Sequence, residues 1–375
     1  MANSRAPLRV LALALAGLRW GAGRRPVAKP RRILVLNQLL LGDTLMLTGL
    51  LAKLRNQHRD AEIVMTMAPA MVPLYARRPY GVAPVGLDPR DVGSVRPLLS
   101  PGGFDLAILP ADNRWSWLAR GVGARWIVGF AHDQPAYKNW PVDHAVAYSS
   151  IPTAFVDSVA ELVEGPAPPR YDPVQWPAPD ATDGPAIAGP YAVLHVGASS
   201  ILKLWPAQRW RDLADWLRQQ GLGIAWTAGR GEGAIIDAIA PPHGDRRFAG
   251  TLSLPGMWHV IAGARLLVCP DTGIAHLGRV VGVPTVVLYG PGSAVLCGAG
   301  AFFADMPFRA VTIDPFPCRN QRIQFFREVA WVRRCERLPG TAATQCARAL
   351  CMEAIEPAMV TQAIVALGGI ARPRP

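Results

Sequence analysis

The residues best suited to chemistry are 271–276, Asp-Thr-Gly-Ile-Ala-His, which lie between two short apolar runs. This order predicts a strand, a polar turn, a short helix and a second strand, the βαβ unit of a parallel sheet. Asp271, Thr272 and Gly273 then lie where a strand's carboxyl end meets a helix N-terminus, whose unpaired N–H groups suit a phosphate. A carboxylate does not bind phosphate, so Asp271 suits sugar hydroxyls, and the pattern indicates a nucleotide-sugar site. The alternative is an ordinary N-cap followed by a turn glycine.

Two further segments place polar side chains at predicted strand ends. Within residues 195–206, Ser199 and Ser200 supply hydroxyl groups and Lys203 supplies a point charge, a set that could hold a diphosphate. Glu232 ends the next predicted strand, where an acidic residue commonly binds ribose hydroxyls. Each residue alone can also be explained as a solvated side chain or as part of a helix start. The group as a whole favours nucleotide binding.

Asp43 is the corresponding candidate in the first half of the chain. It follows Gly42 at the start of a predicted helix, on a turn after an early strand. A carboxylate in this place can accept the proton of an acceptor hydroxyl, as a general base does. Capping of the helix N-terminus explains the same residue without catalysis, and both interpretations stay open.

The elements needed to position these residues alternate between strands and helices in two successive segments. This alternation indicates an α/β fold of the GT-B type, in which two Rossmann-like, doubly wound domains face a central cleft. Half of the 375 residues are hydrophobic, which is enough for two cores. We assign residues 31–163 to an N-terminal acceptor domain and 164–190 to a proline-rich linker. Residues 191–375 form a C-terminal nucleotide-sugar donor domain with a cysteine-bearing tail and a final helix.

Residues 1–30 form a basic, apolar leader, whose apolar run (8–18) is too short to span a bilayer. Arginines flank this run, a pattern typical of an amphipathic segment on a membrane surface. The alternatives are a signal peptide, for which no clear cleavage site is present, and a leader without function. The net charge of +12 favours phosphorylated substrates and anionic membranes. Nucleic acid is disfavoured because no nucleic-acid-binding motif is found.

Four of the six cysteines cluster near the C-terminus, and in a cytoplasmic protein such a cluster suggests a metal rather than disulfides. Their spacings match no standard zinc pattern and include no CxxC pair, so we predict no metal. The other two, Cys269 and Cys297, lie next to apolar strands and are expected to be ordinary buried thiols. The four clustered residues are Cys318, Cys335, Cys346 and Cys351.

In their order along the chain, these segments resemble glycosyltransferase family 9, the bacterial heptosyltransferases of lipopolysaccharide core assembly. The resemblance extends over residues 31–367. At Asn37 the chain differs from many members, which have a basic residue six positions before the catalytic Asp, and recognition of an acidic Kdo acceptor is therefore open. The motifs that carry the resemblance are Leu41-Gly-Asp43, Gly197-Ala-Ser-x-x-x-Lys-x-Trp-Pro206, Asp271-Thr-Gly-x-x-His276, Gly282-Val-Pro-Thr285 and Tyr289-Gly-Pro291.

The resemblance implies an inverting, metal-independent transfer of heptose from ADP-heptose to a lipopolysaccharide core acceptor, with no cofactor. It also implies a role for each matching residue. Asp43 would be the base, and Ser199, Ser200 and Lys203 would bind the diphosphate. Glu232 would bind the ribose, Asp271 the sugar hydroxyls, and Thr272 and Gly273 the phosphate through backbone N–H groups, with His276 orienting or balancing charge.

The implied partners are an ADP-sugar, a lipid-linked saccharide and the inner face of the inner membrane, with no nucleic acid, and the implied location is the cytoplasm. Alternatives within the class are transfer of another sugar and transfer to a protein. Alternatives of another class are a sugar-nucleotide epimerase and a catalytically silent scaffold. An epimerase would need further acid–base residues in the second domain, where His276 alone stands out.

Overall fold

The chain forms two compact units in a computed structural model that describes residues 5–19, 24–181, 183–341 and 345–368. Unit 1 comprises Met1–Arg170, Val174–Pro177 and Ile323–Trp331, and unit 2 comprises Tyr171–Pro173, Ala178–Arg322 and Val332–Pro375. The chain therefore returns to unit 1 once after most of unit 2 is built. Parts of the predicted leader (1–4 and 20–23) and of the predicted tail (342–344 and 369–375) lie outside the described residues.

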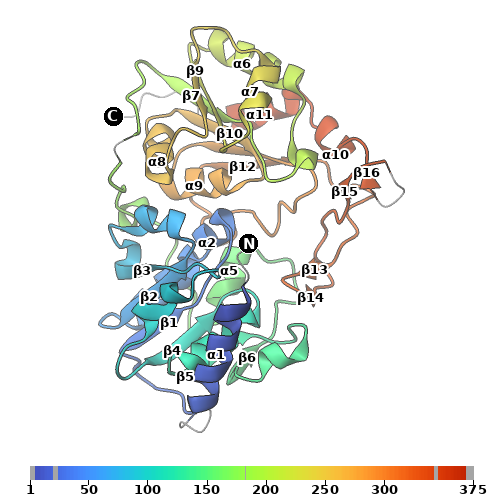
Figure 1. The fold of residues 1–375 in the computed structure, drawn as a ribbon. Coiled ribbons are helices and arrows are strands. Elements are labelled where there is room, and N and C mark those ends of the chain that lie inside the picture. The colour runs from blue at the N-terminus through green and yellow to red at the C-terminus, as the bar shows by residue number, and fades with distance from the viewer. Residues whose placement is uncertain (1–4, 20–23, 182, 342–344, 369–375) are drawn as a thin grey trace. The chain divides into compact units, whose positions relative to one another are not determined.

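Unit 1 contains a six-stranded parallel sheet in the order β3-β2-β1-β4-β5-β6 (Figure 1). Its inner strands are apolar and almost fully buried, as expected for a parallel sheet covered on both faces. The strands are β1 (Arg32–Val35), β2 (Glu62–Met67), β3 (Val82–Gly86), β4 (Phe104–Leu109), β5 (Ala124–Phe130) and β6 (His144–Val146). The helices are α1 (Ala6–Arg19), α2 (Leu41–Met46), α3 (Thr48–Gln57), α4 (Ser116–Gly121) and α5 (Phe155–Ala160), with 3₁₀ turns η1 (Pro69–Tyr75), η2 (Pro79–Gly81), η3 (Val92–Leu98), η4 (Asn113–Trp115) and η5 (Ala136–Asn139). The 3₁₀ turn η6 (Pro173–Gln175) begins at the last residue of a unit 2 segment and continues in unit 1.

Unit 2 contains a second six-stranded parallel sheet, in the order β12-β11-β10-β7-β8-β9. The strands are β7 (Tyr191–His195), β8 (Gly223–Ala228), β9 (Arg246–Ala249), β10 (Leu266–Pro270), β11 (Thr285–Tyr289) and β12 (Phe308–Thr312). The helices are α6 (Ala207–Gln219), α7 (Gly233–Ile239), α8 (Leu254–Ala262), α9 (Gly273–Val281), α10 (Leu350–Glu353) and α11 (Pro357–Ala366), with the 3₁₀ turn η7 (Ile201–Lys203). Two small ladders complete the chain, β13 (Ile323–Gln324) with β14 (Arg327–Glu328) in unit 1 and β15 (Leu338–Pro339) with β16 (Gln345–Cys346) in unit 2.

Both sheets have the same topology, although the sequence shows no evident repeat. Numbered within its own unit, each sheet has the strand order 3-2-1-4-5-6, which is that of a doubly wound nucleotide-binding domain. In such sheets ligands bind beyond the carboxyl ends of strands 1 and 4, where the strand order reverses. The predicted α/β class with two doubly wound domains is confirmed.

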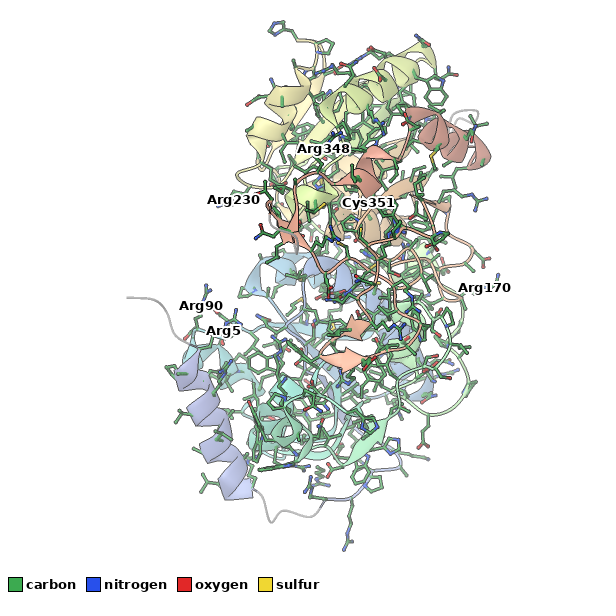
Figure 2. The ribbon with its side chains drawn as sticks, turned by 90° about the vertical axis from the view of Figure 1, so that its right-hand side faces the viewer. Arg5, Arg90, Arg170, Arg230, Arg348 and Cys351 are labelled. Carbon is green, nitrogen blue, oxygen red and sulfur yellow. The ribbon has the colours of Figure 1, made fainter. Side chains whose placement is uncertain are left out.

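Helix α1 (Figure 1) belongs to unit 1. It packs against α4 through a face of small and apolar side chains. Gly121 of α4 allows this close approach, because a Cβ atom there would lie only 2.9 Å from Cβ of Leu15. The predicted membrane-surface segment is therefore partly occupied by packing within the protein, with Leu8, Ala12 and Ala16 buried and Val10, Leu13 and Leu18 exposed. Arg5 precedes the first residue of α1 and lies at the same end of this helix as Arg90 (Figure 2). Within the described residues, we find no helix of sufficient length and hydropathy to cross a membrane.

The proline-rich segment 164–190 is held by two buried aromatic residues, one in each unit. The Tyr171 hydroxyl donates a hydrogen bond of 2.6 Å to the carbonyl of Val280 in unit 2. Trp176 packs on Tyr75 of unit 1, with the ring centroids 4.8 Å apart. Tyr171 and Trp176, five positions apart, therefore hold this part of the segment in place, and it is not a free coil.

Candidate active site

A pocket of about 660 Å³ lies at the carboxyl ends of the unit 1 strands and contains Asp43. Its lining includes residues 36–40 after β1, 68–69 after β2, 88–90 after β3 and 110–112 after β4. These loops surround the point at which the strand order of the sheet reverses. The pocket is therefore where a doubly wound sheet binds its ligand.

Asp43 lies in the first turn of α2, two residues after its first helical residue. The N-cap position of this helix is occupied by Leu40, which makes no side-chain capping bond. Asp43 is therefore not the N-cap that the local sequence allowed, although a carboxylate in this turn interacts favourably with the helix dipole. Its carboxyl group is half-buried and lines the pocket.

Asn37 shapes the loop that carries Asp43 rather than offering a charge to a ligand. The residue is 1% exposed. Its backbone N–H donates to Thr66 Oγ1 at 2.8 Å, and its Oδ1 accepts from the Leu39 N–H at 2.8 Å. Its Nδ2 donates to Thr44 Oγ1 at 3.3 Å, which links the loop to α2. Asn37, at the position where the resemblance implies a basic residue, thus stabilises the turn through its hydrogen bonds. It supplies no positive charge to the pocket.

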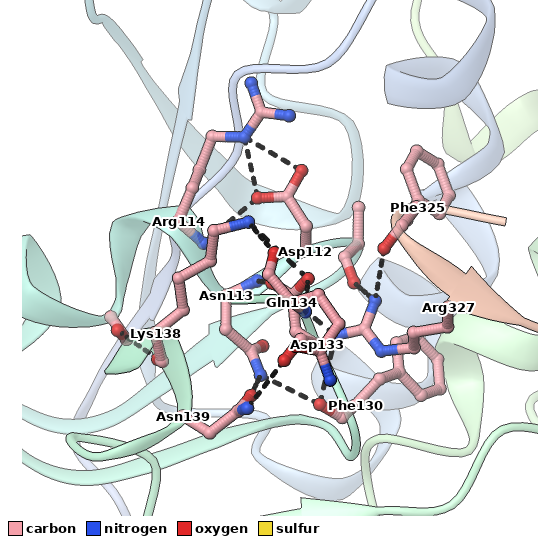
Figure 3. Close-up of polar contacts among 12 residues, drawn as sticks. Asp112, Asn113, Arg114, Phe130, Asp133, Gln134, Lys138, Asn139, Phe325 and Arg327 are labelled. Carbon is pink, nitrogen blue, oxygen red and sulfur yellow. Dashed lines mark hydrogen bonds and ion pairs between the residues drawn. The ribbon is translucent and has the colours of Figure 1, made fainter. Parts of the chain in front are cut away.

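The hairpin formed by β13 and β14 is fastened to unit 1 by Arg327 (Figure 3). The Arg327 guanidinium donates to the carbonyl oxygens of Ala131 at 2.6 Å, Ala111 at 2.8 Å and Phe130 at 3.1 Å. This docking brings Phe325 into the lining of the Asp43 pocket. Sequence reasoning missed the hairpin because it lies 280 residues after Asp43, in a segment without hydrophobic periodicity.

Next to Arg327, the charged side chains Asp112, Arg114 and Asp133 have hydrogen-bond partners within unit 1 (Figure 3). Arg114 Nε donates to both carboxylate oxygens of Asp112, at 2.7 and 2.8 Å. Asp133 is fully buried and accepts a hydrogen bond of 2.6 Å from the backbone N–H of Asn113. Asp112 also follows β4 on the same sheet edge as Asp43, a signal from which it could have been predicted.

In unit 2, the predicted diphosphate ligand Lys203 and the predicted sugar ligand Asp271 are bonded to each other. Lys203 Nζ donates to Asp271 Oδ2 at 2.8 Å and to the Asp271 carbonyl at 2.9 Å. Lys203 follows β7 and Asp271 follows β10, the two neighbouring strands at the reversal point of this sheet. The side chains are 24% and 10% exposed, so the ammonium group is reachable while the carboxylate is largely covered.

Glu232 lies against the loop that carries Ser199, Ser200 and Lys203. Its Oε2 accepts a hydrogen bond of 2.6 Å from the Gly229 N–H, at the start of α7. A Cβ atom at Gly197 would collide with the Glu232 carboxylate, so glycine is required at this point of the loop. The structure thus brings the predicted ribose ligand beside the predicted diphosphate loop.

The hydroxyl residues of the site have local hydrogen bonds as well. Ser200 Oγ accepts from the Leu202 N–H at 3.3 Å and caps η7, which ends at Lys203. Thr272 Oγ1 accepts from the Ile274 N–H at 3.2 Å and caps α9, whose first residue is Gly273. Ser199 is exposed. Because each hydroxyl accepts in its capping bond, its own proton remains available for a phosphate oxygen.

His276 lies in α9 and is buried beside Asp271. Among the described residues its Nδ1 has no hydrogen-bond partner. Burial, followed by the positive charges of Arg279 and Lys203, lowers the pKa of His276 well below its ordinary value. This shift favours the neutral ring, and both predicted roles of His276, orienting a ligand or balancing charge, stay predictions.

Possible metal ligands lie in two places in unit 2. Among the described residues, Asp271, His276 and Cys297 offer ligand atoms that all lie within 4.8 Å of one another. Asp271 of this group also forms an ion pair with Lys203. In the tail, burial raises the pKa of Cys335, and it raises the pKa of Cys351 to about 11, with Cys318 adding to both shifts. The predicted absence of a metal stays a prediction.

Two doubly wound parallel sheets, each with its polar residues at the strand reversal, define the GT-B class of fold. Solved structures agree. The chain is similar to the Escherichia coli ADP-heptose lipopolysaccharide heptosyltransferase II, with a TM-score of 0.65, 17% identity, and coverage of 90% of this chain and 98% of that chain. It is also similar to an E. coli heptosyltransferase with ADP-2-deoxy-2-fluoro heptose, with a TM-score of 0.60, 17% identity, and coverage of 75% and 92%. At these identities the likeness shows the fold alone.

The sequence itself identifies the family. The profile of glycosyltransferase family 9 (heptosyltransferase) matches residues 94–302, more than half of the chain. The protein therefore belongs to glycosyltransferase family 9. Lipopolysaccharide heptosyltransferase 1 of Pseudomonas aeruginosa is 35% identical over 119 residues, which are 29% of this chain and 31% of that protein. The chain thus spans about a third of the length of the heptosyltransferase 1 relatives that it matches.

Proposed function

We propose that this protein transfers heptose from ADP-heptose to a lipopolysaccharide core acceptor, with inversion at the anomeric carbon and without a metal. The observation that carries the proposal is the ion pair of Lys203 with Asp271 at the strand reversal of unit 2. Membership of family 9 and the likeness to a structure containing an ADP-heptose analogue support the same donor.

In the donor site, Lys203 supplies the positive charge that the departing ADP requires. Its ammonium group contacts Asp271 and is 24% exposed, so a diphosphate can share it. The N–H groups at the start of α9, after Thr272, add the positive end of a helix dipole. Stabilising charge that develops on a leaving group is a large source of catalysis in sites of this kind. Asp271 then binds sugar hydroxyls, and Glu232, whose Oε1 makes no hydrogen bond within the described residues, binds the ribose.

In the acceptor site, Asp43 takes the proton of the attacking hydroxyl. The hydroxyl oxygen forms a bond to the anomeric carbon while the bond from that carbon to the diphosphate breaks, and ADP leaves with the electron pair. A single displacement of this kind inverts the configuration. General bases of this type contribute about 10²- to 10⁴-fold to a rate.

The membrane surface is the proposed location of the protein, on the cytoplasmic side where the nucleotide sugar is available. Val10, Leu13 and Leu18 expose apolar area on α1, and arginines accompany them at both ends of the helix. An exposed apolar and basic face of this kind fits an anionic membrane surface.

Calorimetric titration with ADP, UDP and GDP, followed by ADP-heptose and product analysis, tests this function. We expect selective ADP binding, tighter binding of ADP-heptose, and extension of a lipopolysaccharide core acceptor. Preference for UDP or GDP would discard heptose, an isomerised nucleotide sugar would indicate an epimerase, and no binding by folded protein would indicate a scaffold.

Asp43→Asn tests the base. We expect transfer to fall at least about 100-fold because the amide cannot accept the proton, with ADP affinity unchanged. Asp60→Asn, an exposed carboxylate of the same unit, is the matched control. Ordinary turnover in Asp43→Asn would remove Asp43 from this role.

A further inference from the structure

Arg319, which directly follows the first cysteine of the tail, is a buried arginine that the proposed mechanism does not use. Its side chain is 6% exposed. Its Nε donates to the Gly290 carbonyl oxygen at 2.7 Å, and its Nη2 donates to the Tyr289 carbonyl oxygen at 2.9 Å. Tyr289 is the last residue of β11, which pairs with β10, the strand that Asp271 follows. Within unit 2, Arg319 therefore binds the loop that leaves the sheet beside the candidate donor site.

The positive charge of Arg319 depends on this loop for its partners. A buried guanidinium group is unfavourable unless its N–H groups are hydrogen-bonded. Asp314 forms an ion pair with Arg319 at 3.9 Å, but the Asp314 side chain is 70% exposed, so water screens this pair. Hydrogen bonds from a charged donor are roughly twice as strong as neutral ones. The carbonyl groups of Tyr289 and Gly290 are therefore the main partners of the charge, and the charge in turn holds them in place.

Other residues of the tail pack against the same loop. The Cys335 backbone N–H donates to the Pro291 carbonyl oxygen at 3.0 Å. A Cβ atom at Gly290 would collide with Met352 and would lie 3.3 Å from Sγ of Cys351, which is labelled in Figure 2. The side chains of both residues belong to α10 and are buried. The tail thus supports this loop by hydrogen bonds and by packing.

The next residue of the loop, Gly292, lies against the carboxylate of Asp271. A Cβ atom at Gly292 would collide with Asp271 Oδ2. The same oxygen accepts a hydrogen bond of 2.8 Å from Lys203 Nζ. The Asp271 backbone N–H donates to the Leu288 carbonyl oxygen in β11 at 3.1 Å. The position of Asp271 is therefore set by Lys203 and also by β11 and the loop that follows it.

We propose that Arg319 is a positioning residue for the donor sugar, which acts on Asp271 through residues 289–292. While the arginine holds the first two carbonyl groups of this loop, Gly292 stays against the carboxylate, and the carboxylate keeps the direction that sugar hydroxyls require. Lys203 lies in a different loop, after β7, so Arg319 affects the sugar more than the diphosphate. The inference rests on the proposed function, because the role of Asp271 in binding the sugar is part of that proposal.

The test compares Arg319→Gln with the native protein, both as the full chain, in calorimetric titrations with ADP and with ADP-heptose. We expect ADP affinity to be unchanged and ADP-heptose affinity to fall by about tenfold, which corresponds to the loss of one hydrogen bond between the Asp271 carboxylate and a sugar hydroxyl. Arg319→Lys, which keeps a charged donor for one carbonyl group, should lose less. Arg322→Gln, which changes an exposed arginine three residues further along, is the control and should alter neither affinity.

A purely structural role of Arg319 would give a different result. Loss of stability lowers the fraction of folded protein but leaves the ratio of the two Kd values as it is in the native protein. Hydrogen exchange measured by mass spectrometry is a second readout, and we expect faster exchange in peptides that cover residues 289–292 of Arg319→Gln. If Arg319→Gln does not fold, the same comparisons with Arg319→Lys decide.

An unchanged ratio of Kd values in the variant, or unchanged exchange of this loop, would overturn the proposal. The native protein separates this failure from a failure of the proposed function. Native protein that binds ADP-heptose no more tightly than ADP contradicts the proposed donor and, with it, the role of Arg319 toward a sugar. A preference for ADP-heptose that is present in the native protein and survives in Arg319→Gln contradicts the role of Arg319 alone.

Discussion

Replacing Lys203 by methionine removes the cation of the unit 2 site and keeps a side chain of similar length. In the native protein, Lys203 Nζ donates to Asp271 Oδ2 at 2.8 Å and to the Asp271 carbonyl at 2.9 Å. The variant leaves the Asp271 carboxylate, whose side chain is 10% exposed, without its partner. A carboxylate in this state costs stability and also repels an incoming diphosphate.

The size of both effects can be worked from this geometry. A hydrogen bond to a charged group contributes about 1.5–3 kcal/mol, and the 24% exposure of Lys203 reduces the loss to about 1–2 kcal/mol of unfolding free energy. For a unit of this size that loss lowers the Tm by about 2–8 °C. Loss of a charge-assisted contact to the diphosphate should weaken ADP binding by about 10- to 100-fold, at 1.4 kcal/mol per tenfold.

Thermal unfolding and calorimetric ADP titration measure the two effects separately. Arg309→Met, which removes an exposed cation on β12, is the control and should change neither. The double variant Lys203→Met/Asp271→Asn should regain stability, because the unpaired carboxylate is gone, while its ADP affinity stays low. Native ADP affinity in Lys203→Met would refute the assignment of Lys203 to the diphosphate.

Two further predictions concern packing and pH. Gly121→Leu should displace α1, since even a Cβ atom would meet Leu15 at 2.9 Å, and should lower the free energy of unfolding by about 1–3 kcal/mol in denaturant titrations while leaving ADP binding intact. Gly17→Leu, where nothing lies within 4 Å, is the control, and equal stability of the two variants would contradict this role of the helix packing. Burial lowers the pKa of His195 to about 4. Below about pH 6.5 this imidazole is therefore protonated in the unfolded chain but stays neutral in the folded chain. Stability should fall by about 2 kcal/mol between pH 7.5 and 5 from this residue. His195→Gln, which can still bond Thr227, should flatten the profile in denaturant unfolding, and an unchanged slope would show that His195 does not carry it.

The inner strands of both sheets could be predicted because they are continuous apolar runs that end in turn residues. Residues 266–270 and 285–289 are expected strands and are β10 and β11 in the structure, with every residue buried. The edge strands could not be predicted in this way. In β9 most residues are exposed, and in β6 the short His-Ala-Val sequence carries no pattern, so pairing with a neighbouring strand defines both.

In the candidate site too, some residues could be predicted from their neighbours in the sequence, and others depend on contacts between distant segments. Asp43, Lys203, Glu232 and Asp271 each follow a recognisable strand, so their place at a sheet edge could be predicted from nearby residues. The presence of Arg5 and Arg9 in the lining of the Asp43 pocket could not be predicted, because it depends on α1 packing against Gly121, more than a hundred residues further along the chain. Phe325 enters the same pocket only because Arg327 bonds three carbonyl groups of unit 1.

The ion pair in unit 2 determines how its lysine can meet an anion. In unit 2, Asp271 already satisfies Lys203, and a diphosphate must share the ammonium group with a carboxylate that repels it. The sugar hydroxyls assigned to Asp271 resolve this conflict, because their protons stabilise the carboxylate at the moment when the diphosphate draws on the lysine. A complete ADP-sugar therefore suits the site better than a diphosphate alone. If Lys203 and Asp271 bind the donor as proposed, selection of the donor depends on its sugar and its diphosphate together.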